Sequence, residues 1–178
     1  MTEPEVSLAI AMFYIRNGET SKDVTVSIDG AHIKTKDTVH FDIVGFLGEN
    51  GFLKSDGSDK WQGEYKNQNF SQCIFVSSKS GVGDVSIALK NGNILHIESK
   101  KFKSGSGGEY PAMREAIGQL MTGCPDDEIP VVAVPYNEKS FDLAKKWIGN
   151  ERMRKAGICF ALVHNNGYVE FVGRENND

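Results

Sequence analysis

Residues 84–102, DVSIALKNGNILHIESKKF, constrain the fold more than any other part of the chain. Apolar and polar residues alternate on both sides of the turn signal Asn91-Gly92, the pattern of a β-hairpin with one buried face. The apolar residues form two rows, one before the turn and one after it: Val85, Ile87 and Leu89, then Leu95 and Ile97. Both rows face one core only if the loop has an odd number of residues, because successive strand residues point to opposite faces.

We therefore predict a three-residue loop around Asn91-Gly92-Asn93, with the glycine available for a left-handed conformation. This register places Asp84, Glu98 and Lys100 together on the opposite face, at one end of the hairpin. A two-residue loop would separate Asp84 from the other two and mismatch the apolar rows. Burial of the apolar rows alone thus predicts a cluster of two carboxylates and an amine. His96 shares the face of Glu98, either as an exposed strand residue or as a group near a substrate.

The remaining segments predict a mixed α/β sheet with helices on its faces, in one domain spanning residues 1–178. In chain order, the predicted elements are a helix over 4–17, strands within 23–47, a polar excursion from the core over 48–69, a strand over 73–77, a flexible break over 103–111, a helix over 110–122, a strand buried on both faces over 129–135, a helix over 137–155 and a hairpin over 158–173.

Charge and cysteine content narrow the functional classes. The net charge of −4 is not that of a protein held on nucleic acid by bulk electrostatics, although carboxylates that bind a metal are counted in it. The three cysteines are widely spaced and form no CxxC pair, which favours a reducing compartment over a zinc knuckle or a disulfide framework. The sequence shows no secretory leader and no apolar run of membrane-spanning length, so we expect a cytoplasmic protein.

The predicted cluster suits metal-assisted phosphodiester hydrolysis. Two carboxylates and a backbone carbonyl are ligands for Mg²⁺, which polarises phosphoryl oxygens and lowers the pKa of bound water. An amine beside the metal can orient the attacking water or stabilise developing charge.

The segments G-D-V-S-I and I-E-S-K-K, followed by a helix with R-E-A-I-G-Q-L, resemble the PD-(D/E)XK nuclease superfamily, the restriction-endonuclease-like fold. The resemblance covers residues 83–172 in element order, as a catalytic core, and leaves 18–75 as a β-rich elaboration. One departure is that Asp84 follows Val-Gly rather than proline. The resemblance implies that Asp84 and Glu98 hold Mg²⁺, with Mn²⁺ as a substitute, that the Ser99 carbonyl is a further ligand, and that Lys100 assists the water.

The resemblance also implies supporting roles elsewhere in the chain. Glu5 is the candidate for a glutamate on the first helix near the metal, Gln119 for a polar residue on the later helix, and Arg114 for a phosphate contact. Lys101 and Lys103 are candidates for DNA contacts. The predicted function is a metal-dependent DNA endonuclease, restriction-like or resolvase-like, acting as a homodimer or with a partner protein that supplies specificity.

Several alternatives stay open from the sequence. Glu64-Tyr65-Lys66 is a second E-x-K, without an apolar strand leading into it. The cluster itself is alternatively a surface ion pair at a hairpin end. Residues 78–84 either cradle a phosphate or form a turn, and Trp61 and Tyr65 either touch DNA or form a stabilising patch. The alternative functions are an inactive nuclease-like binding or assembly subunit, a nuclease acting on RNA, and a domain without a nucleic-acid role.

Overall fold

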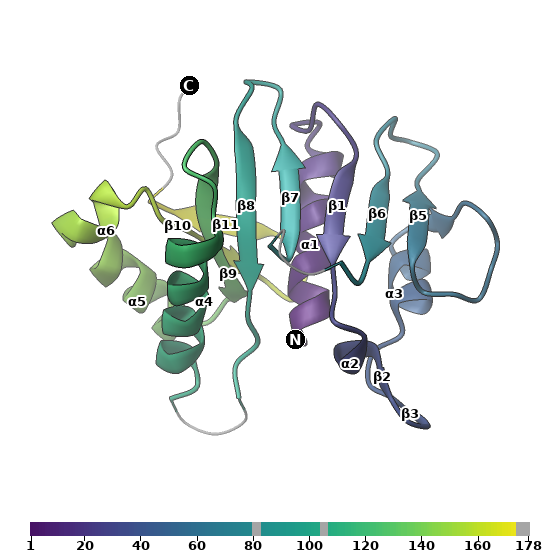
Figure 1. Ribbon diagram of the computed structural model, residues 1–178, viewed down its shortest axis with the longest axis horizontal. Coiled ribbons are helices and arrows are strands. Elements are labelled where there is room, and N and C mark those ends of the chain that lie inside the picture. Colours follow the sequence, from purple (N-terminus) through teal and green to yellow (C-terminus); the bar gives the residue numbers. More distant parts are fainter. Residues whose placement is uncertain (80–82, 104–106, 174–178) are drawn as a thin grey trace.

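The computed structural model describes residues 1–79, 83–103 and 107–173, and its main feature is one mixed β-sheet (Figure 1). Within these residues the sheet has nine strands in the order β11-β10-β9-β8-β7-β1-β6-β5-β4. Their bounds are β1 (Val24–Ser27), β4 (Leu53–Lys54), β5 (Gly63–Lys66), β6 (Ile74–Ser77), β7 (Val85–Ala88), β8 (Ile94–Ser99), β9 (Ile129–Pro135), β10 (Cys159–Val163) and β11 (Val169–Val172). A separate ribbon pairs β2 (Lys34–Thr35) with β3 (Thr38–Val39).

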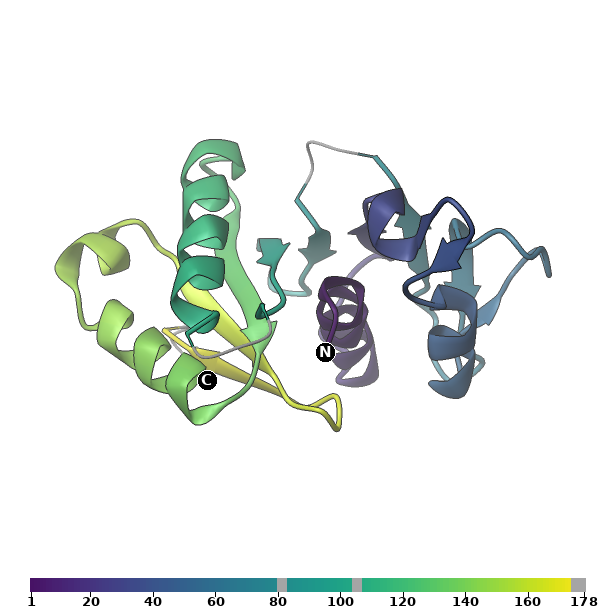
Figure 2. The ribbon, with the colours of Figure 1, turned by 90° about the horizontal axis from the view of Figure 1, so that it is seen from below.

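Helices cover both faces of the sheet, which confirms the predicted α/β class. Their bounds are α1 (Glu3–Arg16), α2 (Gly30–Ile33), α3 (Ile43–Glu49), α4 (Glu109–Gly123), α5 (Glu138–Ile148) and α6 (Glu151–Lys155). Figure 2 shows α1 between the group α4 to α6 on one side and α2 with α3 on the other. None of the helices in the described ranges is long and apolar enough to cross a membrane.

Strand β9 separates two apolar cores. Val131 and Ala133 pack with α1 on one face, whereas Val132 and Val134 pack with α4 and α5 on the other. The strand pairs in parallel with both β8 and β10. The prediction of a strand buried on both faces is therefore confirmed, and continuous apolar sequence is the expected signature of such a strand.

Helix α1 begins with a capping box. The Thr2 side chain accepts a hydrogen bond from the Glu5 amide, and the Glu5 side chain accepts one from the Thr2 amide. Pro4 occupies the first turn, where its missing N–H costs nothing. From residue 6 to residue 12 every side chain of the helix is buried, so α1 is enclosed by the sheet and its neighbours rather than lying on the surface.

The central hairpin has the three-residue loop that the apolar rows require, but one residue earlier than predicted. Val85 pairs with Ile97 and Ile87 with Leu95, and the Leu89 amide donates to the Asn93 carbonyl over 2.8 Å. The loop is therefore 90–92, with Gly92 at the left-handed φ of 91°. Shifting the loop by one residue changes each cross-strand partner by two, so the two apolar rows still share the core face.

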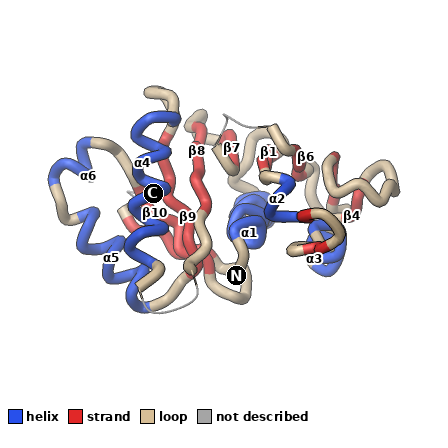
Figure 3. Tube along the Cα trace, turned by 60° about the horizontal axis from the view of Figure 1, so that its bottom comes forward, coloured by secondary structure: helices blue, strands red, loops and turns tan. Residues whose placement is uncertain are grey.

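The segment from residue 23 to residue 69 differs most from prediction. It was expected to alternate in strand fashion as far as residue 47, yet only β1 and the small ribbon form there. Asp29 accepts a hydrogen bond from the Ala31 amide and Asp42 one from the Gly45 amide, and these caps begin α2 and α3. Figure 3 shows α2 beside the N-terminal end of α1.

The polar stretch 48–69 is not an excursion from the core, because β4 and β5 extend the sheet. Phe52 and Tyr65 are fully buried in it. The Tyr65 hydroxyl donates to the Trp61 carbonyl over 2.6 Å, so Tyr65 is a packed core residue and the idea that it touches DNA is wrong. Trp61 is partly buried and packs against the same core. Isolated aromatic residues among polar ones carry no periodic signal, which is why the sequence pattern did not reveal them.

The predicted helix over 137–155 is two helices. Helix α5 ends at Ile148, and α6 begins at Glu151 after Asn150, whose side chain accepts a hydrogen bond from the Arg152 amide. A residue that offers its own side chain to the backbone favours a new helix start over continuation.

The predicted loops over 78–84 and 103–111 include residues 80–82 and 104–106, which lie outside the described residues. The other predicted helices and strands agree with α1, α4, β6, β10 and β11 to within one residue at each end.

Candidate metal and catalytic site

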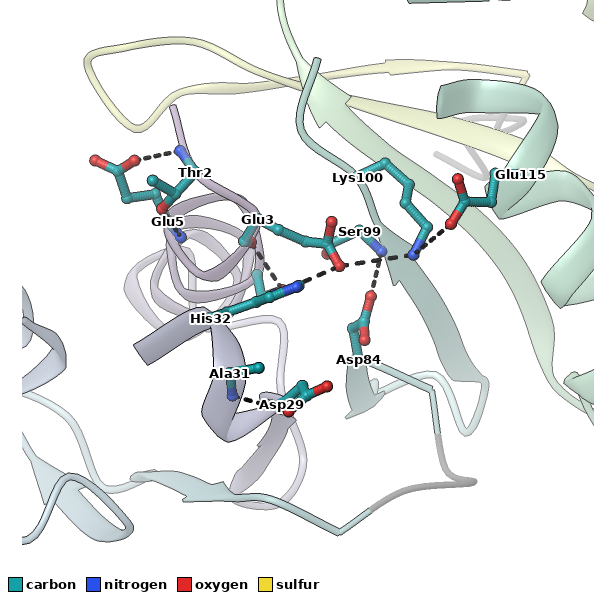
Figure 4. A network of polar contacts seen from close by, with 11 residues as sticks. Thr2, Glu3, Glu5, Asp29, Ala31, His32, Asp84, Ser99, Lys100 and Glu115 are labelled. Carbon is teal, nitrogen blue, oxygen red and sulfur yellow. Dashed lines mark hydrogen bonds and ion pairs between the residues drawn. The ribbon is translucent and has the colours of Figure 1, made fainter. Parts of the chain in front are cut away.

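The end of the central hairpin holds Asp84 in a fixed position. Its amide donates to the Ile97 carbonyl over 2.9 Å, and its carbonyl accepts from the Ser27 amide over 2.7 Å, so the backbone is tied to β8 and to β1. Its carboxylate accepts a hydrogen bond from the Ser99 amide over 2.8 Å (Figure 4). The side chain is thereby aimed along the end of β8, where Glu98 and Lys100 lie.

Lys100 is buried, with only 8% of its surface exposed. Its amide donates to the Ala133 carbonyl of β9 over 2.9 Å, which fixes the backbone. Its Nζ lies 3.6 Å from Glu3 Oε1 at the start of α1 and 3.9 Å from Glu115 Oε1 of α4. Figure 4 shows the amine between these two carboxylates, next to Asp84 and Ser99. The triad predicted from the register is therefore more than an exposed ion pair.

The two carboxylates of the cluster repel each other. Burial raises the pKa of Asp84 to about 6, and the negative charge of Glu3 acts in the same direction, while the Ser99 amide and Lys100 act against it. Burial also raises the pKa of Glu98 to about 7, reinforced by the charge of Asp84 and a side-chain hydrogen bond with it. Burying two acids this close together favours a proton on one of them, or a cation in its place, over two bare negative charges.

A cleft of about 500 Å³ opens onto these acids. Its lining comes from β1, α2, β8 and α4, from the segment after β6 and from the residues just before β7, and includes Asp84, Glu98, Asp29, Lys79, His96 and Gln119. A ligand in this cleft would touch both carboxylates of the cluster.

The structure brings only some of the predicted supporting residues to the cleft. Gln119 and His96 line it, and His96 is 5% exposed, so the reading of an exposed strand histidine is wrong. Arg114 instead places its guanidinium 5.5 Å from the centre of the Tyr110 ring. Lys101 and Lys103 are exposed just beyond β8, where their role in DNA binding stays a prediction.

Glu5 does not reach the cluster, because its carboxylate is part of the capping box of α1. Glu3 takes the position that was expected for Glu5. Residues two apart on a helix are about 200° apart around its axis, so the two glutamates cannot serve the same site. The spacing Thr2-x-x-Glu5 is itself a capping-box signature, and this signal would have separated the two roles from the sequence alone.

Sequence reasoning also missed residues contributed by distant elements. Glu115 reaches Lys100 from α4, and His32 of α2 lies 3.8 Å from Glu3. Asp29 lines the cleft from the segment that was treated as an elaboration, and Lys79 lines it from the loop that was left open between a phosphate cradle and a turn. No local pattern marks these positions, because they meet the cluster only through the packing of α1, α2 and α4.

The second E-x-K is an ordinary ion pair. Lys66 Nζ lies 2.8 Å from Glu64 Oε2 on β5, near one edge of the sheet, and both side chains are substantially exposed. The hydrogen bond from Lys66 lowers the pKa of Glu64, the reverse of the shift at Asp84 and Glu98. Exposed pairs of this kind contribute little to stability and do not indicate a site.

Comparisons of the chain with protein-family models, with curated proteins and with solved structures found no match. The chemistry of the site must therefore be argued from its own residues.

Proposed function

We propose that this protein is a Mg²⁺-dependent endonuclease that hydrolyses phosphodiester bonds of DNA, built on a restriction-endonuclease-like core. The observation that supports this proposal is the convergence of Asp84, Glu98 and the buried amine of Lys100 at one end of the hairpin, where the two carboxylates line a cleft. Two acids with raised pKa values that line a cleft, with a buried amine beside them, are typical of a site that performs chemistry rather than of a structural ion pair.

The residues fit a hard divalent cation. Carboxylate oxygens are the preferred ligands of Mg²⁺, and a cation between Asp84 and Glu98 would offset the cost of burying their negative charges, which is the main cause of their raised pKa values. The Ser99 amide leaves one oxygen of Asp84 free of its bond, and the Ser99 carbonyl stays a predicted further ligand. When bound, Mg²⁺ would polarise a phosphoryl oxygen and lower the pKa of a water.

The residues around the metal position have separate roles in this proposal. Lys100 holds the attacking water or donates a hydrogen bond to the phosphate in the transition state. Glu3 positions the Lys100 amine, since the two groups are 3.6 Å apart. Gln119 and Lys79 line the cleft and are placed to contact the substrate. A homodimer would bring two such sites to the two strands of a duplex.

Plasmid cleavage tests the proposal directly. Purified protein should nick or linearise supercoiled DNA in Mg²⁺ or Mn²⁺ but not in EDTA, and Asp84→Asn should abolish the cleavage. Glu64→Gln, in the exposed E-x-K, is the matched control and should leave cleavage unchanged. Metal-independent cleavage, or cleavage that survives Asp84→Asn, would refute the proposed site. Failure to cleave DNA or RNA with any metal would favour a nuclease-like assembly subunit, in which Glu3 and Glu115 hold Lys100 as an ion pair.

A second prediction separates the two glutamates of the first helical turn. Glu3→Gln should lower the cleavage rate about tenfold or more, because a positioned proton-transfer group loses the carboxylate that orients it. Glu5→Gln should lower the free energy of unfolding by about 0.5–1 kcal/mol through the weakened cap, with the cleavage rate retained. Initial rates and urea denaturation of the two variants check this. Equal cleavage rates for both variants would exclude a role of Glu3 at the site.

A further inference from the structure

A second cluster of metal-ligand side chains lies in the same region but belongs to a different chemical class. His96 of β8, Cys124 at the end of α4 and Glu128 before β9 each offer one ligand atom, and these atoms all lie within 4.8 Å of one another. His96 Nδ1 is 3.0 Å from Glu128 Oε2. We propose that His96, Cys124 and Glu128 bind a Zn²⁺ ion that joins the turn after α4 to strand β8.

The backbone presents the three ligands together. The Cys124 amide donates to the Leu120 carbonyl over 3.1 Å and closes α4, and the Glu128 amide donates to the Pro125 carbonyl over 3.1 Å. The Cys124 thiol lies against this tight turn, 3.8 Å from the Glu128 carbonyl, and both the thiol and the Glu128 carboxylate lie within 4.8 Å of the histidine nitrogen. Two ligands four residues apart and a third on a neighbouring strand form a chelate that needs only small side-chain movements to close.

The histidine is held in a set orientation. A Cβ atom at Gly83 would lie 2.7 Å from His96 Nε2, and Gly83 has a φ of 71°, so only glycine permits this contact. With Nε2 packed against Gly83, the ring directs Nδ1 to Glu128. Burial of the ring, at 5% exposure, adds to this restraint. Restraining the ring in this way favours ligation, because a metal-ligating histidine needs a set ring orientation.

The ligand set selects zinc over magnesium. A thiolate, an imidazole and a carboxylate match the borderline preference of Zn²⁺, whereas Mg²⁺ takes oxygen ligands only. Three protein ligands leave the fourth tetrahedral position for water, and a cleft of about 370 Å³ lined by His96 and Glu128 provides access to it. Binding would displace the thiol proton, so one proton is released for each ion bound.

This site is separate from the proposed Mg²⁺ site and does not depend on it. The two clefts share Ser27, Lys79, Gly83, His96 and Gly123. Asp84 and Glu98 line only the larger one. Zinc at this position would fix the α4–β9 turn against β8, two residues before Glu98.

Cobalt substitution of the full-length protein tests the proposal. After removal of metal with a chelator, one equivalent of Co²⁺ should produce a thiolate-to-cobalt charge-transfer band and the intense visible bands of a tetrahedral ion, and Zn²⁺ should abolish both. Cys124→Ser should remove the charge-transfer band and weaken Zn²⁺ binding about 100-fold or more, since even residues behind a ligand affect affinity by 10- to 100-fold. Cys73→Ser is the control. Cys73 is buried just before β6, which is separated from β8 by β7 and β1 in the sheet, so this variant should keep the band.

Two further measurements keep the result independent of the nuclease proposal and of folding defects. Asp84→Asn should retain the cobalt spectrum whether or not the protein cleaves DNA. In the wild-type protein Cys124 is the most accessible of the three thiols, because Cys73 and Cys159 are each 3% exposed, and Zn²⁺ should protect it from a thiol reagent. A cobalt spectrum without the charge-transfer band, or one lost in Asp84→Asn, would overturn the proposal, as would unprotected Cys124 at saturating Zn²⁺.

Discussion

Lys100→Met is expected to lower the rate of DNA cleavage by about 100- to 10,000-fold, the range that a positioned proton-transfer group contributes. Methionine retains most of the apolar stem of the buried lysine and removes only the amine, so the packing between β8, α1 and α4 is preserved. The rate should be measured from supercoiled plasmid at saturating Mg²⁺. The loss should appear in the rate constant at saturating DNA, because Lys100 is buried and is not expected to contribute to general DNA affinity.

Lys101→Met is the matched control for that experiment. It removes the same charge at the next residue, which is exposed, so it should change DNA affinity and its salt dependence but not the rate at saturation. Equal losses in the two variants would show that Lys100 acts through bulk charge rather than through its place beside Asp84 and Glu98. Mg²⁺ should still raise the melting temperature of Lys100→Met, since the carboxylates remain.

The second large effect concerns stability and pH in the absence of metal. The pKa of Asp84 rises from 3.8 to about 6 on folding, and that of Glu98 from 4.5 to about 7. At pH values between the unfolded-state pKa and the folded-state pKa, the folded protein binds more protons than the unfolded protein. The free energy of unfolding therefore falls as pH rises. The fall should begin near pH 4 and be complete above about pH 7. At about 1.4 kcal/mol per pKa unit, the shift of the buried Asp84 alone corresponds to a destabilisation of about 3 kcal/mol at neutral pH, and Glu98 adds a smaller amount after discounting for its partial exposure.

Urea denaturation in EDTA at about pH 5 and about pH 8 measures this effect. Wild type should lose about 2 kcal/mol more between these pH values than the double variant Asp84→Asn, Glu98→Gln, in which neither group ionises. Adding Mg²⁺ at about 100 times its dissociation constant should restore about 2.7 kcal/mol to wild type and nothing to the double variant. If wild type and the double variant lost the same free energy of unfolding between the two pH values, Asp84 and Glu98 would not have raised pKa values in the folded state.

The amino-acid sequence by itself determined the central hairpin and the face on which its polar residues lie. The reason is that strand side chains alternate with a period of two, so burying Val85 and Ile97 together leaves Asp84, Glu98 and Lys100 no other face. Although the loop lies one residue earlier than predicted, the face assigned to each of these residues is the same. Helix α4 and the doubly buried strand β9 could be predicted equally well from the sequence, because long periodic or uniformly apolar segments carry strong local signals.

The tertiary structure alone decided what surrounds that cluster. Glu3 of α1 and Glu115 of α4 both reach Lys100, although the two glutamates are more than a hundred residues apart in the chain, and no local pattern encodes such a meeting. The His96, Cys124 and Glu128 group has the same origin, since widely spaced single ligands show no motif until a turn and a strand bring them together. Local periodicity fixes which face a residue takes, whereas long-range packing fixes which distant side chains it meets there.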